Sequence, residues 1–168
     1  MVLWSLAPTQ LILGEDVTRM SAEYVATVGN PELIAINQDA PLVAPMRRIV
    51  GGDLSYPCTP AIEQKQEQEG GDAAARCINV WARPLANGDV ALAFVNQGPA
   101  NATVKCDAPC LAAANVTAGR VWAVRDLIAR RDVGEINGSK RSSFALSALV
   151  EADGSVAAFR LKPLDNKR

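Results

Sequence analysis

The stretch from Asn79 to Asn96, NVWARPLANGDVALAFVN, constrains the fold of this chain more than any other. At its centre is Asn87-Gly88, a pair that tolerates the positive φ angles of a two-residue type I′ hairpin turn. Apolar residues after the turn occupy both parities, with Val90, Leu92, Phe94 and Val95 around the small Ala91 and Ala93. Such a pattern is typical of a strand covered on both faces. The stretch therefore predicts a β-hairpin whose second strand is buried.

Further short apolar runs follow the hairpin, and each is bounded by turn residues such as Gly98-Pro99 and Asp153-Gly154. The expected strands are Ala102–Lys105, Arg120–Asp126, Ser143–Val150 and Val156–Leu161, the last ended by Lys162-Pro163. No long helical pattern separates these runs. Short strands at this spacing predict an antiparallel β-sandwich over residues 46–168.

Residues 1–40 follow a different pattern. Leu11–Leu13 is a short apolar run that ends at Gly14, which predicts a buried strand of a parallel sheet. Two short helices follow, one N-capped by Ser21 and one by Asn30 with Pro31 as its first residue. Prolines at both ends of the 41–45 region indicate a linker. A parallel strand needs neighbours on both sides, so we expect residues 1–40 to be one βα unit of a larger α/β fold.

Composition excludes several classes of function. The chain has 168 residues, 49% of them hydrophobic, and a net charge of −1, which gives no support to binding of nucleic acids or anionic membranes. No window approaches the roughly 20 apolar residues of a transmembrane helix. There is no histidine, which excludes Ser-His-Asp and Cys-His catalysis and imidazole metal ligation. No Walker loop or G-x-G-x-x-G motif is present, so we expect no cofactor and no metal.

Four cysteines, Cys58, Cys77, Cys106 and Cys110, suit a disulfide framework with three possible connectivities. Local pairing needs the shortest loops, and Cys58–Cys77 would close about 20 residues, a stabilisation of ~3 kcal/mol. A zinc site with all four cysteines is the alternative. It is disfavoured because C-x3-C is less typical of zinc ligands than C-x2-C.

Three N-x-S/T sequons begin at Asn101, Asn115 and Asn137. Each sequon alone is a weak signal. Together with pairable cysteines, they favour an oxidising compartment and predict a secreted or lumenal glycoprotein.

Glu15 and Asp16 directly follow the expected parallel strand, where α/β barrels place catalytic groups. A carboxylate at the rim of an active site is one interpretation. Helix entry, or charge pairing with Arg19, is the favoured one. For Trp81 and Trp122 there are also two interpretations, core residues or platforms for sugar rings, and the core interpretation is the favoured one.

Several stretches resemble the α-galactosidases and α-N-acetylgalactosaminidases of glycoside hydrolase family 27. LWSLAPTQLILGEDVTRMS, residues 3–21, and NPELIAINQD, residues 30–39, are similar to the final barrel strand and helices of that family. VWARPLANGDVALAFVN, VWAVRDL and FRLKP, from residues 80, 121 and 159, resemble strands of its C-terminal sandwich. Cys106 and Cys110 lie where some animal members have a C-x3-C disulfide.

The resemblance implies a TIM barrel followed by an antiparallel sandwich, in a retaining exoglycosidase that removes terminal α-linked galactose. The two catalytic aspartates of the family lie on barrel strands upstream of every matched stretch, so the resemblance assigns no catalytic residue here. It implies a non-catalytic C-terminal scaffold that is inactive alone, with the α-galactoside bound by the absent barrel. It also implies a homodimeric full-length enzyme in a secreted, lysosomal or vacuolar compartment. A stand-alone carbohydrate-binding module, or an interaction domain that uses Met1–Leu13, remains the alternative.

Overall fold

The structure is a computed structural model, and it describes residues 1–39, 45–51, 58, 76–140 and 144–164. Its main element is a six-stranded antiparallel sheet with strand order β1-β2-β3-β8-β5-β6. The strands are β1 (Arg47–Gly51), β2 (Ile78–Pro84), β3 (Val90–Asn96), β8 (Ser155–Leu164), β5 (Val121–Asp126) and β6 (Arg131–Asn137). A second, two-stranded sheet pairs β4 (Ala102–Cys106) with β7 (Leu146–Val150).

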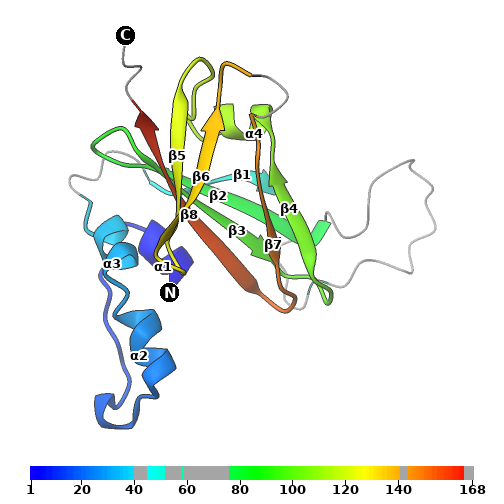
Figure 1. The fold of residues 1–168 in the computed structure, drawn as a ribbon. Coiled ribbons are helices and arrows are strands. Elements are labelled where there is room, and N and C mark those ends of the chain that lie inside the picture. The colour runs from blue at the N-terminus through cyan, green and yellow to red at the C-terminus, as the bar shows by residue number, and fades with distance from the viewer. Residues whose placement is uncertain (40–44, 52–57, 59–75, 141–143, 165–168) are drawn as a thin grey trace, which may run out of the picture.

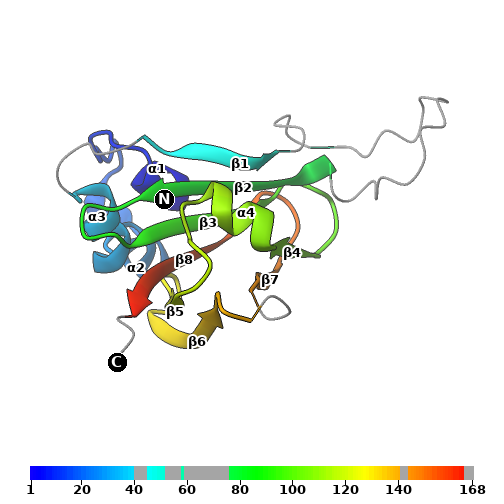
Figure 2. The ribbon, with the colours of Figure 1, turned by 90° about the horizontal axis from the view of Figure 1, so that it is seen from above.

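The two faces of the large sheet carry different layers (Figures 1 and 2). One face is covered by helices α1 (Val2–Leu6) and α3 (Pro31–Asn37). Helix α2 (Ala22–Val28) extends away from the sheet and has no buried residue. The opposite face packs against β4, β7 and the short helix α4 (Ala108–Ala113), which together enclose the larger hydrophobic core. The predicted mainly antiparallel β fold is confirmed.

Strand β3 lies at the centre of this arrangement, and all of its residues are buried. Val90, Leu92 and Phe94 point into the core between the sheets, where the Phe94 and Phe159 ring centroids are 5.5 Å apart. Ala91 and Ala93 belong instead to the cluster beneath α1 and α3. Small side chains on this parity let a helix approach the sheet closely. The prediction of a strand covered on both faces is therefore confirmed.

The hairpin between β2 and β3 is present, but its turn differs from the prediction. Gly88 has a φ of 84°, whereas Asn87 is not among the residues with positive φ. The Gly88 N–H donates to the Leu85 carbonyl at 3.1 Å, and the Leu85 N–H donates to the Asp89 carbonyl at 2.9 Å. The expected type I′ turn is wrong because only one residue adopts the left-handed conformation, as in longer hairpin loops with a bulge.

The predicted buried strand at Leu11–Gly14 is also wrong. This segment has no regular structure, and Ile12 and Leu13 are 70% and 39% exposed. All strand pairings in the described part of the chain are antiparallel, so nothing there offers this run the neighbours that a parallel strand requires. The two helices that follow begin as predicted. Ser21 caps α2, and Asn30 caps α3 with Pro31 as its first residue.

Helix α4 and strand β6 were not predicted from the sequence. Asp107 accepts a hydrogen bond from the Cys110 N–H, and α4 begins directly after it. Strand β6 contains Gly134 and is exposed along most of its length, so it carries no apolar alternation. Propensity and patterning therefore missed both elements.

Pro163 was expected to end β8, but it lies inside that strand. Strand β3 begins at Val90, opposite Leu161, whereas β5 continues alongside β8 to Leu164. At Pro163 the strand thus has β5 alone as a neighbour. A proline is tolerated there because an edge position needs no donor on its open side.

The four cysteines form two local disulfides, Cys58–Cys77 and Cys106–Cys110, with Cα–Cα distances of 5.7 and 5.1 Å. The alternative of a zinc site is therefore wrong. The interior of the Cys58–Cys77 loop, and the expected linker except Pro45, lie outside the described residues. No helix within the described ranges is long and apolar enough to cross a membrane.

Candidate functional site

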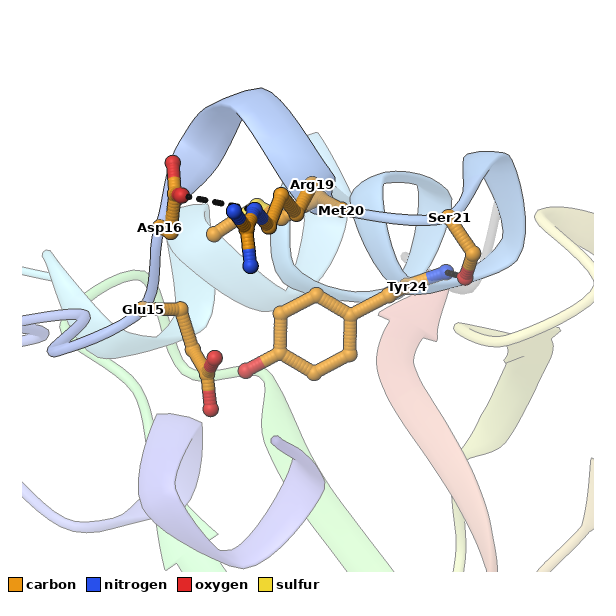
Figure 3. Close-up of a pocket in the computed structure, with 6 residues that line it drawn as sticks. All are labelled: Glu15, Asp16, Arg19, Met20, Ser21 and Tyr24. Carbon is orange, nitrogen blue, oxygen red and sulfur yellow. Dashed lines mark hydrogen bonds and ion pairs between the residues drawn. The ribbon is translucent and has the colours of Figure 1, made fainter.

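An open pocket of about 570 Å³ lies between the segment after Gly14 and helix α2 (Figure 3). Its lining residues are Glu15, Asp16, Arg19, Met20, Ser21 and Tyr24. The Glu15 carboxylate points toward the Tyr24 hydroxyl, whereas the Asp16 carboxylate points toward Arg19. The two acidic groups therefore do not face one another across the pocket.

Asp16 is occupied by local contacts. Its Oδ1 accepts hydrogen bonds from the Thr18 N–H at 3.0 Å and the Thr18 hydroxyl at 2.6 Å, and its Oδ2 lies 3.4 Å from Arg19 Nε. The hydrogen bonds from Thr18 lower the pKa of Asp16 from its ordinary value. Asp16 thus caps the short 3-10 helix Val17–Arg19, as the favoured interpretation of helix entry and charge pairing predicted. No cluster of histidine, cysteine or acidic residues within the described ranges could hold a metal ion.

Several polar contacts join residues 1–39 to the large sheet. We call the sheet side of these contacts, formed by Arg83, Arg125 and Leu127, the helix-docking face. Its centre is Arg83 of β2, whose side chain is almost fully buried at 2% exposure. Arg83 donates to the carbonyl of Ile36 at 2.8 Å, and its longer contacts reach those of Ser5, Asn37 and Asp39, each at 3.4 Å. These carbonyls include the last ones of α3, where the helix dipole favours a cation. Arg83 therefore caps the C-terminus of α3 from the sheet.

Two asparagines extend the helix-docking face. Asn30 accepts from the first N–H groups of α3 through Oδ1 and donates through Nδ2 to the Leu127 carbonyl at 2.9 Å. Asn37, at the other end of α3, donates to the carbonyls of Ala7 and Thr9, both at 2.9 Å. Both ends of α3 are thereby fixed, one to the residue that follows β5 and one to the chain that follows α1.

An ion pair completes the helix-docking face at the first turn of α3. Arg125 of β5 binds both carboxylate oxygens of Glu32, each at 2.7 Å, and also contacts Asp132 at 3.0 Å. Hydrogen bonding to Arg125 lowers the pKa of Glu32, and the same contact raises the pKa of Arg125. Such bidentate pairs are among the stronger charged contacts in proteins, and they also fix orientation.

Sequence reasoning did not single out Arg83, Glu32 or Arg125. One signal was present, since Arg83 is a charged residue among the apolar residues of the hairpin's first strand, which pairs with a strand expected to be buried. The tryptophans lie where the core interpretation put them. Trp122 is 3% exposed in the main core, and Trp81 packs partly buried against the cluster beneath the helices. Neither is an exposed sugar platform.

The family described as “Alpha galactosidase C-terminal beta sandwich domain” matches residues 76–161. The chain belongs to this family. The match confirms the resemblance seen in the sequence, and it covers every strand from β2 to β7 and most of β8.

Relatives of this family member include α-galactosidases of plants and yeasts. Alpha-galactosidase 2 of Arabidopsis thaliana is 29% identical over 154 residues, which are 89% of this chain and 29% of that protein. The α-galactosidase of Lachancea cidri is 32% identical over 96 residues, 57% of this chain and 18% of that protein. The chain thus spans less than a third of the length of either relative. Both relatives are named as α-galactosidases.

Solved structures support the fold. The α-galactosidase I of Mortierella vinacea has a TM-score of 0.68 and 23% identity, over 95% of this chain and 33% of that protein. A family 27 β-L-arabinopyranosidase from Geobacillus stearothermophilus has a TM-score of 0.71 and 16% identity. The match covers 99% of this chain and 30% of the chain of that enzyme. Both likenesses cover the helices as well as the sandwich.

Proposed function

We propose that this chain serves as the C-terminal scaffold of a retaining exo-glycosidase that hydrolyses terminal α-linked galactose. The helix-docking face carries the proposal. Residues 30–39 resemble the last barrel helix of family 27, and Arg83, Asn30 and Arg125 bind this helix to the sandwich. The scaffold would hold the end of the barrel in place.

In this proposal residues 1–40 are the terminal βα unit of a (β/α)8 barrel, residues 41–45 the linker and residues 46–168 the sandwich. The exposed apolar side chains of Ile12, Leu13 and Val17 are those that neighbouring barrel strands would cover. The α-galactoside would bind to that barrel, and the whole enzyme would be a homodimer. The two disulfides fit an oxidising compartment, which we propose to be extracellular, lysosomal or vacuolar.

The proposed role is non-catalytic because a retaining glycosidase needs two carboxyl groups about 5 Å apart on either side of the scissile bond. Glu15 and Asp16 point in different directions, and Asp16 is occupied by Thr18 and Arg19. The purified chain should therefore not hydrolyse a nitrophenyl α-galactoside above the blank rate. Turnover that follows the protein through purification would contradict the proposal.

The scaffold role itself is tested by a chimera in which this chain replaces the matching part of A. thaliana alpha-galactosidase 2. We expect the chimera to hydrolyse the same substrate. Arg83→Ala in the chimera should lower the yield of folded, active enzyme and leave KM unchanged, because Arg83 donates to main-chain carbonyls of residues 5–39. A changed KM with normal yield would mean that the sandwich contacts substrate and that the scaffold role is wrong.

A further inference from the structure

The exposed face of the small β4–β7 sheet carries an apolar residue with no cover. Leu149 is 67% exposed, although its neighbours Ala148 and Val150 contribute to the main core. Thr103 of β4 lies directly opposite Leu149 in the antiparallel register. Side chains of directly opposite residues share one face of a sheet, so Thr103 and Leu149 lie together on the outer face.

Asn101 and Thr103 are the first and third residues of a sequon, and residues two apart along a strand share a face. Asn101 is exposed and directly precedes β4. The acceptor asparagine therefore lies at the edge of the same face as Leu149. Figures 1 and 2 both place β4 and β7 on the side of the molecule away from α1 and α3.

The contacts of the Asn101 amide are compatible with a glycan on its nitrogen. Its Oδ1 accepts a hydrogen bond from the Ala152 N–H at 3.0 Å. Its Nδ2, the atom to which a sugar is attached, has no partner among the described residues. Attachment at Nδ2 keeps the carbonyl oxygen as an acceptor, so the contact with Ala152 survives modification.

We propose that Asn101 carries an asparagine-linked oligosaccharide whose first sugars cover Leu149 and the methyl group of Thr103. The donor is an oligosaccharide on a lipid diphosphate. Asn101 Nδ2 forms a bond to the anomeric carbon, the bond from that carbon to the diphosphate oxygen breaks, and the amide loses one proton as the lipid diphosphate leaves. The inference rests on the proposed lumenal location, but its test does not depend on α-galactosidase activity.

The other two sequons lie in other parts of the fold. Asn115 has a φ of 67°, and its Oδ1 accepts from Arg47 at 3.0 Å beyond the end of α4. Asn137 is half-buried at the end of β6, and its Oδ1 accepts from the Ser139 N–H at 2.9 Å. Both can be silenced without changing the asparagine, through Thr117→Ala and Ser139→Ala. In the double variant, which we call the background chain, Asn101 is the acceptor of the one sequon left among these three.

The first test is peptide mapping of the chain expressed through the secretory pathway of a eukaryotic host, with and without a peptide amidase that removes N-glycans. We expect the Asn101 peptide to carry glycan mass in the background chain and in Thr103→Ser, which preserves the sequon. Thr103→Ala should lose that mass completely. An unmodified Asn101 peptide in folded chain recovered from the lumen or medium would overturn the proposal.

The second test asks whether the glycan covers Leu149. The amidase leaves an aspartate at position 101, which still accepts from the Ala152 N–H, so the fold is preserved. Removal should raise the fluorescence of an apolar dye in the background chain, and Leu149→Ser should abolish that rise. Equal dye binding before and after removal, with Asn101 shown to be glycosylated, would refute the covering role.

Discussion

Arg83 stabilises the helix-docking face through main-chain carbonyls. No ion pair within the described residues involves Arg83, and its Nε has no hydrogen-bond partner there. The charge is offset by the partial negative charge at the C-terminus of α3. A buried cation held in this way is costly to disturb, because truncation also exposes several carbonyls to an unfilled cavity.

We predict that Arg83→Ala lowers the free energy of unfolding by about 3 kcal/mol, measured by guanidinium denaturation. Arg83→Lys should recover part of this loss, since an ammonium group retains the charge but not the planar fork. Arg120→Ala is the control, because Arg120 is exposed and should change stability very little. Equal stability of Arg83→Ala and the parent would contradict the role of Arg83.

A second prediction at this scale concerns the pH dependence of Glu32. The folded-state pKa of Glu32 lies below its ordinary value of 4.5, chiefly because Arg125 hydrogen-bonds the carboxylate. The contribution to stability is therefore present above the ordinary pKa and is lost as pH falls through the folded pKa. Partial exposure of both side chains screens the pair, so we expect Glu32→Gln to cost about 1 kcal/mol at neutral pH.

Unfolding of the parent and Glu32→Gln should be compared at neutral and acidic pH. The unfolding free energies of the two proteins should become equal once Glu32 is protonated. Glu135→Gln offers a control on an exposed carboxylate of β6 and should run parallel to the parent. If the difference in unfolding free energy between the parent and Glu32→Gln stays constant to low pH, the ion pair is not the source of that difference.

Elements differed in how well the sequence predicted them. Strands with apolar runs and helices with capping residues were found, because both signals are local. β6 was missed because an exposed edge strand needs no apolar alternation. The Leu11–Gly14 segment was misassigned because its apolar run indicates burial but cannot say whether a partner strand is available.

The hairpin turn offers a test at the scale of the element. We predict that Gly88→Ala costs about 1 kcal/mol, because its φ of 84° strains any side chain although open space surrounds it. Gly14→Ala is a matched control, since it also meets nothing within 4 Å and its φ is not positive. Thermal denaturation of both variants decides the matter. Equal losses would show that backbone strain is not the cause.

At the scale of the whole molecule, the helices and the sandwich are joined by contacts that no local pattern reveals. Asn30 and Leu127 are 97 positions apart, and Glu32 and Arg125 are 93 apart. The resemblance to a family indicated which stretches matter. It did not indicate that Arg83 and Arg125 hold α3, because long-range pairing depends on the complete topology.

The disulfides allow a prediction at this scale as well. Both are buried, so their replacement by alanine carries a similar packing cost. Loss of Cys58–Cys77 should cost about 3 kcal/mol through its longer loop, and loss of Cys106–Cys110 about 2 kcal/mol. Double Cys→Ala variants at each pair, compared by guanidinium denaturation, measure the difference. A larger loss at the shorter loop would contradict the loop-entropy explanation.

The carbonyl contacts of the helix-docking face have an evolutionary consequence. Arg83, Asn30 and Asn37 all donate to main-chain oxygens, which every residue type supplies. Most side chains around these acceptors can therefore be exchanged without loss of a single hydrogen bond. For these contacts only the three donors and the path of the backbone need to be retained, whereas the Glu32–Arg125 pair also requires both of its side chains. Much of the sequence around the carbonyl acceptors can therefore diverge while the helices and the sheet still fit together.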